Sequence, residues 1–501
     1  MLLRFFHDSC SQSGRWRAFC SDICGVLWKG MHEEGRPHQE EDQILALAKA
    51  FESMLAAGES RFFDHDDLEA LIEHYLERGS IAKAQHVHRY ASGLFPESLS
   101  LQLREAQILA SNGKHVQAIP RLKNLLSFEP QNEEIHLTLA NIYSQMHEHK
   151  LALQHFHALL RFADPDLRKD LHIDIALEHE NLGEWKQAIR VLLEALKEDP
   201  SNETALYELA FCFDKEGRIQ EAATFYTKYL DDHPYSFAAW YNLGNAHQRM
   251  GKYKEAVDAY DFAIAIEDSF APAYHQKAEA LTAMERFGDA LDVHRETLLI
   301  DAPQPSTFCN MGECLEHLGD LDEAQQYYRQ CLELDPNFLE AHVGLGVLAD
   351  LRGEHDVALE HLAEALLLSP YQEDTLLMMS AVLKKMGRHE EADVCLVQIL
   401  ERNPKNTEAW EERVDNMQML EAHEQALQLL DNAFEHVPPT SSVLGYKQFV
   451  SLFALRHDGE ALRLLDTLLL ADFAGMNRLL ETYPGLLDDP RIASRYERFK
   501  P

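Results

Sequence analysis

Residues 237–270 read FAAWYNLGNAHQRMGKYKEAVDAYDFAIAIEDSF, and this 34-residue stretch contains the pattern that recurs along most of the chain. Its Ala256 belongs to a series of eleven alanines that follow one another every 34 residues, with a single interval of 36. The series is Ala84, Ala118, Ala152, Ala188, Ala222, Ala256, Ala290, Ala324, Ala358, Ala392 and Ala426. Such a period is typical of stacked helix–turn–helix units, in which small side chains let two helix backbones approach closely. The sequence therefore predicts one long solenoid that binds something, rather than a compact enzyme.

Glycine and proline share the register of these alanines, if the residue 19 places before each alanine is counted as the first of its repeat. The fifteenth position holds Gly79, Gly113, Gly183, Gly217, Gly251, Gly319, Gly353 and Gly387. The thirty-second position holds Pro96, Pro130, Pro200, Pro234, Pro336, Pro370, Pro404 and Pro438. Glycine ends a helix because it adopts the left-handed backbone cheaply, and proline cannot continue a helix. Each repeat is therefore predicted to contain two helices separated by a glycine turn.

This pattern resembles the tetratricopeptide repeat (TPR), whose signature combines an aromatic or apolar residue, Leu–Gly, Tyr, two alanines around an aromatic ring, and a final proline. The quoted stretch matches the signature at Trp240, Leu243, Gly244, Ala256, Tyr260 and Ala263. The repeat from Pro305 matches it at Met311, Gly312, Leu315, Ala324, Tyr328 and Pro336. The sequence departs from the signature at His247, which replaces tyrosine, at Asp268, which replaces proline, and at 164–165, where two extra residues lengthen a junction.

The resemblance covers residues 65–438 and implies an all-α fold, a right-handed α-α superhelical solenoid of stacked TPR helix hairpins of the bacterial type. We expect the tandem array to span 65–440, with eleven to twelve repeats, after an N-terminal capping helix within 31–64. Residues 441–501 are expected to form a degenerate repeat and C-terminal capping helices, since terminal repeats must cover their apolar faces. Residues 1–30, with three cysteines, two tryptophans and a basic charge, are expected to be a disordered or mis-called leader before Met31.

The formal net charge of −38 argues against nucleic acid and anionic membranes as partners, because both attract clustered lysine and arginine. Three explanations of the charge remain open: a solvated acidic exterior, adaptation to a salty cytoplasm, or an acidic groove that selects basic partners. The eight cysteines contain no CxxC pair, and Cys212, Cys309, Cys314, Cys331 and Cys395 fall on predicted helices. Buried thiols in a reducing compartment, the cytoplasm, explain them.

No sequence motif for catalysis or for a cofactor is present, because the chain lacks the phosphate-binding glycine loops, the GxSxG elbow and the HExxH zinc helix. The pairs His86/His88, His147/His149 and His155/His157 are spaced by two residues, which points them to different sides of a helix. We therefore expect no catalytic residue, no cofactor and no metal site.

The resemblance implies that the first helices of the repeats line a concave groove, which the second, fifth, ninth, twelfth and thirteenth positions face. In three successive repeats these positions supply Tyr207, Phe211, Lys215, Tyr241, Asn245, Arg249 and His275, which we predict to bind the partner. Aromatic rings beside amides and cations are common anchors of protein interfaces. The same rings could instead pack between adjacent first helices. Met378 with Lys384 and Lys385 is a second candidate, although two lysines at a helix end also complement the helix dipole.

Two known TPR specificities can be compared with these positions. A carboxylate clamp needs lysine at the fifth and asparagine at the ninth position, and here Asn245 follows Tyr241, so the clamp is not expected. An asparagine ladder at the sixth position would consist only of Asn242 and Asn310, with Gln276 between them, which is too sparse to assign.

The sequence therefore predicts a cytoplasmic, non-catalytic scaffold or adaptor that binds a peptide segment or a partner protein in the groove. One alternative is a structural component of a homo-oligomer or of a larger envelope-associated assembly. Another is the regulatory arm of an enzyme complex. No nucleic acid and no direct membrane insertion are expected, and the partner and the oligomeric state stay open.

Overall fold

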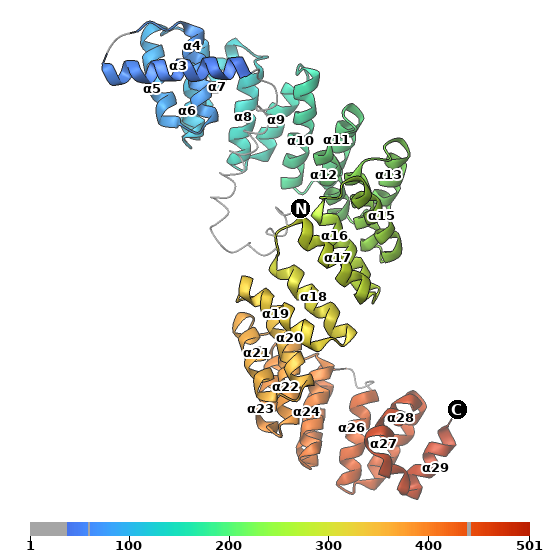
Figure 1. The fold of residues 1–501 in the computed structure, drawn as a ribbon. Coiled ribbons are helices and arrows are strands. Elements are labelled where there is room, and N and C mark those ends of the chain that lie inside the picture. Colours follow the sequence, from blue (N-terminus) through green and yellow to red (C-terminus); the bar gives the residue numbers. More distant parts are fainter. Residues whose placement is uncertain (1–37, 59–60, 438–441, 501) are drawn as a thin grey trace. The chain divides into compact units, whose positions relative to one another are not determined.

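A computed structural model describes residues 38–58, 61–437 and 442–500, and every regular element in these ranges is a helix (Figure 1). The helices form hairpins that follow one another in chain order, and successive helices contact one another along most of the chain. The chain divides into two compact units, Met1–Ala246 and His247–Pro501, which are described separately. The predicted all-α fold of stacked helix hairpins is confirmed. Residues 1–30 and Met31 lie outside the described residues.

The first unit begins with α3 (His38–Ala57) and continues as a series of repeats, each with a first and a second helix. Its first helices are α4 (His65–Glu77), α6 (Leu99–Ser111), α8 (Glu133–Gln145), α10 (Pro165–Asn181), α12 (Glu203–Lys215) and α14 (Phe237–Arg249), whose last residues belong to the second unit. Its second helices are α5 (Ile81–Leu94), α7 (His115–Phe128), α9 (His149–Leu159), α11 (Trp185–Glu198) and α13 (Ile219–Asp232).

The second unit repeats the same alternation and ends in three short helices. Its first helices are α16 (Ala271–Ala283), α18 (Pro305–Leu318), α20 (Leu339–Leu351), α22 (Glu373–Lys385), α24 (Thr407–Met419) and α26 (Ser442–Ala454). Its second helices are α15 (Tyr253–Ile266), α17 (Phe287–Ile300), α19 (Leu321–Leu334), α21 (His355–Leu368), α23 (His389–Arg402), α25 (His423–His436) and α27 (Asp458–Ala471). After them come α28 (Phe473–Thr482), the 3-10 helix η1 (Pro484–Asp488) and α29 (Pro490–Phe499).

The eleven recurring alanines are buried in the core, ten of them fully and Ala222 to within 4 %. Ala461, the corresponding residue of the last repeat, is also fully buried. A larger side chain at these positions would push apart the helices that meet there, because protein interiors are close-packed. The period read from the sequence is therefore the spacing of helix contacts in the core.

The turn between the two helices of a repeat needs a left-handed backbone at the fifteenth position, whichever residue stands there. All eight glycines predicted to end first helices have a φ between +64° and +85°. In the repeats without that glycine, a left-handed φ is adopted by His147, Glu285, Glu421 and Arg456. Residues with a Cβ pay an energetic penalty for this conformation, so the turn geometry is set by the hairpin and not by glycine itself.

Several first helices begin with a side chain that caps the free backbone N–H groups of their first turn. Asn132, Asn202 and Asn406 accept a hydrogen bond from the amide three residues further on, at 2.9–3.0 Å. Asp164 likewise caps α10, and Pro165 is the first residue of that helix. The extra residues expected to lengthen a junction therefore also extend a helix, and α10 has 17 residues.

Both ends of the described chain pack onto the repeat next to them. The capping helix expected within 31–64 corresponds to α3, which ends at Ala57 and contributes Phe51 and Met54 to the first core cluster. At the other end, Met476 of α28 and Ile492 of α29 are fully buried in the cluster of the last repeat.

Candidate functional site

Within each unit, first helices of neighbouring repeats contact one another. In the first unit α6 contacts both α4 and α8, and in the second unit α20 contacts both α18 and α22. Side chains that project from these helices away from their hairpin partners therefore share one surface within each unit. We call this surface the first-helix face. It is the surface on which the sequence predicts partner binding.

On α12 this face carries Tyr207, Phe211 and Lys215, spaced four residues apart and so aligned in one row. Tyr207 and Phe211 are half-buried and Lys215 is exposed. The Lys215 ammonium lies 5.2 Å from the centroid of the Phe211 ring, within the range of a cation–π contact. The Phe211 ring also meets Trp185 edge to face, with 5.8 Å between centroids. We call these three residues the α12 row.

Tyr241 does not have the exposure that a binding residue needs, because only 1 % of it is accessible. Its ring packs edge to face against Tyr207, with 6.2 Å between centroids. Ala238, at another position predicted to face the groove, is fully buried. For Tyr241 the structure therefore supports packing between adjacent first helices, and the prediction of an accessible anchor there is wrong. Burial also raises the pKa of Tyr207 well above its ordinary value, so its hydroxyl stays protonated.

The remaining predicted residues lie on α14 and α16. Asn245 is half-buried in the first unit, whereas Arg249 and His275 belong to the second, where Arg249 is exposed and His275 half-buried. Burial lowers the pKa of His275. Asn242, from the sparse asparagine ladder, is buried and donates to the backbone oxygen of Leu206 at 3.3 Å. Its amide therefore binds this chain's own backbone.

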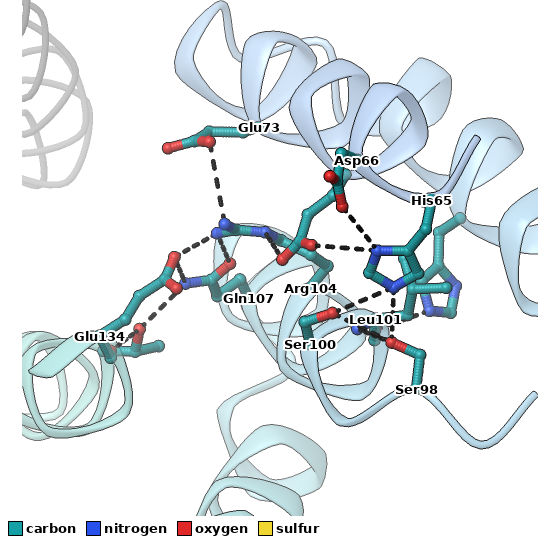
Figure 2. A network of polar contacts seen from close by, with 12 residues as sticks. His65, Asp66, Glu73, Ser98, Ser100, Leu101, Arg104, Gln107 and Glu134 are labelled. Atoms are coloured by element: carbon teal, nitrogen blue, oxygen red, sulfur yellow. Dashed lines mark hydrogen bonds and ion pairs between the residues drawn. The ribbon is translucent and has the colours of Figure 1, made fainter. Parts of the chain in front are cut away.

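The first three repeats carry a polar network on the same face, centred on Arg104 of α6 (Figure 2). Arg104 is only 8 % exposed and forms ion pairs with Glu69, Glu73 and Glu134, which come from α4 and α8. Gln107 accepts from Arg104 and donates to Glu134, both at 2.9 Å. The guanidinium thereby bridges carboxylates of the two first helices on either side of its own, α4 and α8.

His65 extends this network at the start of α4. Its Nε2 lies 2.8 Å from the hydroxyl of Ser98, the residue that caps α6, and 3.3 Å from that of Ser100. Its Nδ1 lies 3.2 Å from a carboxylate oxygen of Asp66 (Figure 2). Most polar groups of this region are therefore bound to one another.

Carboxylates on α10 have no such cation. Asp170, Asp174 and Glu178 follow one another at four-residue intervals. Glu178 is buried and accepts from the Ser144 hydroxyl at 2.5 Å, and His149 contacts its other oxygen at 2.8 Å. Burial, with Asp170 and Glu178 nearby, raises the pKa of Asp174 to about 7. The Asp174 carboxyl is therefore partly protonated at neutral pH.

Other kinds of site find little support in the described part of the chain. The cysteines there, Cys212, Cys309, Cys314, Cys331 and Cys395, are unpaired and buried, which confirms the prediction of buried thiols. No group of three potential metal ligands occurs among the described residues. None of the helices described has the length and apolar character required to cross a membrane.

Sequence profiles of one repeat family match the chain over more than half its length. The family is described as tetratricopeptide repeat, and the matches cover residues 109–169, 173–237, 237–270, 305–338 and 351–412. Together with the buried alanines and left-handed turns of the hairpins, this decides the family. The chain belongs to the TPR family. A comparison with curated protein sequences finds no match.

Several solved structures resemble the chain at low identity. The crystal structure of YrrB, a TPR protein with an unusual peptide-binding site, is 22% identical over 37% of this chain and 95% of that one, with a TM-score of 0.31. The Cut9–Hcn1 hetero-tetramer of APC/C is 14% identical over 86% of this chain and 96% of that one, with a TM-score of 0.40. The MamA protein is 26% identical over 34% of this chain and 92% of that one, with a TM-score of 0.30. Since these scores are all below 0.5, membership of the TPR family depends on the profiles and the repeat geometry.

The TPR register could have revealed the Arg104 network, which the sequence prediction missed. Arg104 stands at the sixth position of its repeat, Glu69 at the fifth and Glu134 at the second. Writing out these positions for every repeat would have shown a lone cation among carboxylates. It would not have shown that Arg104 is buried, because burial depends on how the neighbouring first helices approach one another.

Proposed function

We propose that this TPR protein is a non-catalytic adaptor that binds a peptide segment or a partner protein on its first-helix face. The observation that carries the proposal is the α12 row, in which two aromatic rings and an exposed ammonium remain accessible beside the packed Tyr241. Membership of a family of interaction repeats supports the same conclusion. A non-catalytic role is in keeping with that family.

An accessible row of this kind suits an extended segment with apolar and acidic residues. Apolar side chains would cover the Tyr207 and Phe211 rings, which bring a large contact area with few rotatable bonds. A carboxylate would pair with Lys215, whose ammonium is exposed. The partner's side chains would thus occupy the part of the face where rings are half-buried and not fully covered.

The test is affinity capture from a cell lysate with the wild type and with Tyr207→Ala and Lys215→Glu variants, each checked for helical content by circular dichroism. A partner captured by the wild type is expected to be lost or strongly depleted with both variants. Lys228→Glu, at an exposed residue of the second helix α13, is the matched control and should retain it. Equal capture by all four proteins would overturn the α12 row as the binding surface.

A further inference from the structure

Two adjacent first helices of the second unit, α20 and α22, present apolar side chains where the repeats on either side carry a carboxylate at the ninth position. On α20 they are Val343, Val347 and Leu351, and on α22 they are Leu377, Met378 and Ala381. We call these six residues the apolar wall. Leu351 is 62% exposed and Met378 36%, and the other four are half-buried. The four-residue spacing on α20 aligns its three side chains in one row along the helix.

The apolar wall ends at the repeats on either side. Its central residues, Val347 and Ala381, stand at the ninth position of their repeats, which in the flanking repeats holds Glu313 and Asp415. Asp415 forms an ion pair with Lys447 of α26. Glu313 is exposed on α18, beside α20. The wall therefore covers two repeats, with a free carboxylate on one side.

Ion pairs hold one edge of this region together. Lys385 of α22 binds Asp350 of α20 at 2.6 Å, and Lys384 binds Glu412 of α24. These contacts join three successive first helices and neutralise both lysines. The lysines noted in the sequence beside Met378 thus fix the geometry of the wall and are not free to bind acidic partners.

Carboxylates around the wall stay without a cation. Glu340 and Asp374 occupy the second position of their repeats, at the start of α20 and α22, and both are exposed like Glu313. In the ranges that the structure describes, none of these three carboxylates forms an ion pair. They leave the wall with a negative rim that a cationic partner would neutralise.

We propose that the apolar wall binds a partner segment consisting of a short apolar core flanked by lysine or arginine. The apolar core would cover the α20 row and Met378, and the flanking cations would pair with Glu313, Glu340 and Asp374. An acidic segment would be repelled by the rim, and a purely polar one would leave the wall exposed to water. The inference rests on the proposed function, because it takes the first-helix face to be the binding surface. It adds a second stretch, whose chemistry is opposite in charge to that of the α12 row.

Three labelled synthetic peptides test this proposal with the full-length chain by fluorescence anisotropy. The first has two lysines at each end and a centre of leucine, valine and serine. In the second, glutamate replaces lysine, and in the third, serine replaces the apolar residues. We expect the first peptide to bind at least about tenfold more tightly than the other two, and its affinity to fall with added salt. Equal affinity of the three peptides, or no binding of the first, would overturn the proposal.

Variants locate the binding on the molecule. Leu351→Asp and Met378→Glu change exposed residues and should each weaken binding of the first peptide by about tenfold. Glu313→Gln combined with Asp374→Asn should weaken it several-fold and reduce its salt dependence. Val394→Asp, at a residue of α23 that is 55% exposed, and Glu390→Gln, on the same helix, are the matched controls and should bind like the wild type.

The outcomes separate this inference from the proposed function. Binding that is unaffected by Leu351→Asp and Met378→Glu but lost in Tyr207→Ala would overturn the apolar wall and leave the first-helix face as the binding surface. Binding that none of these variants changes would count against both. Circular dichroism and the thermal midpoint of each variant show whether it is folded, so a loss of binding is not mistaken for unfolding.

Discussion

The first-helix face differs between the first three repeats and the two repeats that contain α20 and α22. Around α6, one buried guanidinium and a set of hydrogen bonds contact the carboxylates of the two neighbouring first helices. Around α20, the ion pairs lie at one edge, and apolar side chains and exposed carboxylates remain. The same repeat positions therefore build two different surfaces. Around α6 the surface is closed, meaning that its polar side chains are bound to one another, and around α20 it is open, meaning that apolar side chains and carboxylates remain exposed. Whether a repeat can bind a partner therefore depends on which of its side chains remain without a partner in the neighbouring repeats, and not on their position within the repeat.

The largest expected effect concerns the packing beneath the apolar wall. The Tyr328 ring lies between Gly312 and Gly344, and a Cβ on Gly312 would lie 2.7 Å from one of its carbons. A Cβ on Gly344 would also overlap this ring, so Gly344→Ala should lower the free energy of unfolding by about 3 kcal/mol. Urea denaturation followed by circular dichroism measures it. If the wall depends on this packing, the variant also loses affinity for the lysine-flanked peptide.

Gly288→Ala is the control for this prediction. Gly288 lies in α17, where an added Cβ would meet no atom within 4 Å. This variant should be as stable as the wild type or more stable by up to about 1 kcal/mol, because alanine favours the helix. A Gly344→Ala variant as stable as Gly288→Ala would show that Tyr328 can move aside.

The second effect concerns the region around α6, where loss of Arg104 would leave the carboxylates exposed as they are around α20. Arg104→Met removes the buried guanidinium and leaves Glu69, Glu73 and Glu134 without their cation, which should cost about 2 kcal/mol, since the carboxylates are partly exposed. Hydrogen exchange of the α6 and α8 amides measures this loss locally. The lysine-flanked peptide should also gain affinity for the first unit, because its carboxylates are released.

Arg121→Met tests whether the loss of any ion pair lowers stability and speeds hydrogen exchange as much as Arg104→Met. Arg121 pairs with Glu105, and its side chain is 45% exposed, so its removal should change stability by less than about 1 kcal/mol. Faster exchange in both variants to the same degree would mean that the Arg104 network has no special role in closing the face.

The third effect is a dependence on pH that the two regions share. In each unit one repeat pairs a histidine of its first helix with one of its second: His136 with His155 at 3.2 Å, and His342 with His361 at 3.4 Å between Nδ1 atoms. The other nitrogen of His136 contacts the Pro130 carbonyl at 3.1 Å, and that of His342 contacts the Pro336 carbonyl at the same distance. Only one proton fits between two facing Nδ1 atoms, so this geometry does not allow both rings of a pair to be protonated.

The direction of the pH effect follows from the lowered pKa values. Burial, together with His136 and Lys123, lowers the pKa of His155 to about 4, and burial with His342 nearby lowers that of His361. Glu360 and Glu364 oppose this shift at His361, and Arg329 adds to it. As the pH falls from 6.5 towards 4, these histidines bind protons in the unfolded chain but stay neutral in the folded one. The free energy of unfolding therefore falls.

The measurement compares the free energy of unfolding at pH 7 and pH 5. The wild type should lose about 1 kcal/mol for the His155 pair over this range, and His155→Phe should lose less, whatever its stability at pH 7. Phenylalanine is a suitable replacement because Phe225 occupies the same position two repeats later. His86→Gln, at an exposed position, is the control and should keep the pH dependence of the wild type. An unchanged pH dependence in His155→Phe would refute the role of the pair.

The sequence predicts the packing of this protein better than its surface. The alanine period recurs in every repeat and the fifteenth-position glycine in most of them, so these local signals specify the hairpins reliably. Tyr241 shows the limit: its position in the register suggested exposure, yet it is 1% accessible because Tyr207 of the preceding first helix packs against it. Whether a ring on a first helix is covered depends on residues 34 places away. The apolar wall was missed because only one of its residues, Met378, was considered.

The smallest expected effect concerns the turn that both regions share. His147 and Glu421 adopt a φ of 59° and 58°, which costs a residue with a Cβ about 1 kcal/mol, so His147→Gly and Glu421→Gly should each stabilise the chain by 0.5 to about 1 kcal/mol. Gly353→Ala, at a φ of 76°, should destabilise it by a similar amount. Thermal midpoints check all three. Equal gains at the two sites would mean that the turn is a property of the hairpin and independent of the face above it. A gain confined to one of the two sites would mean that the surrounding side chains also decide how much strain the turn stores.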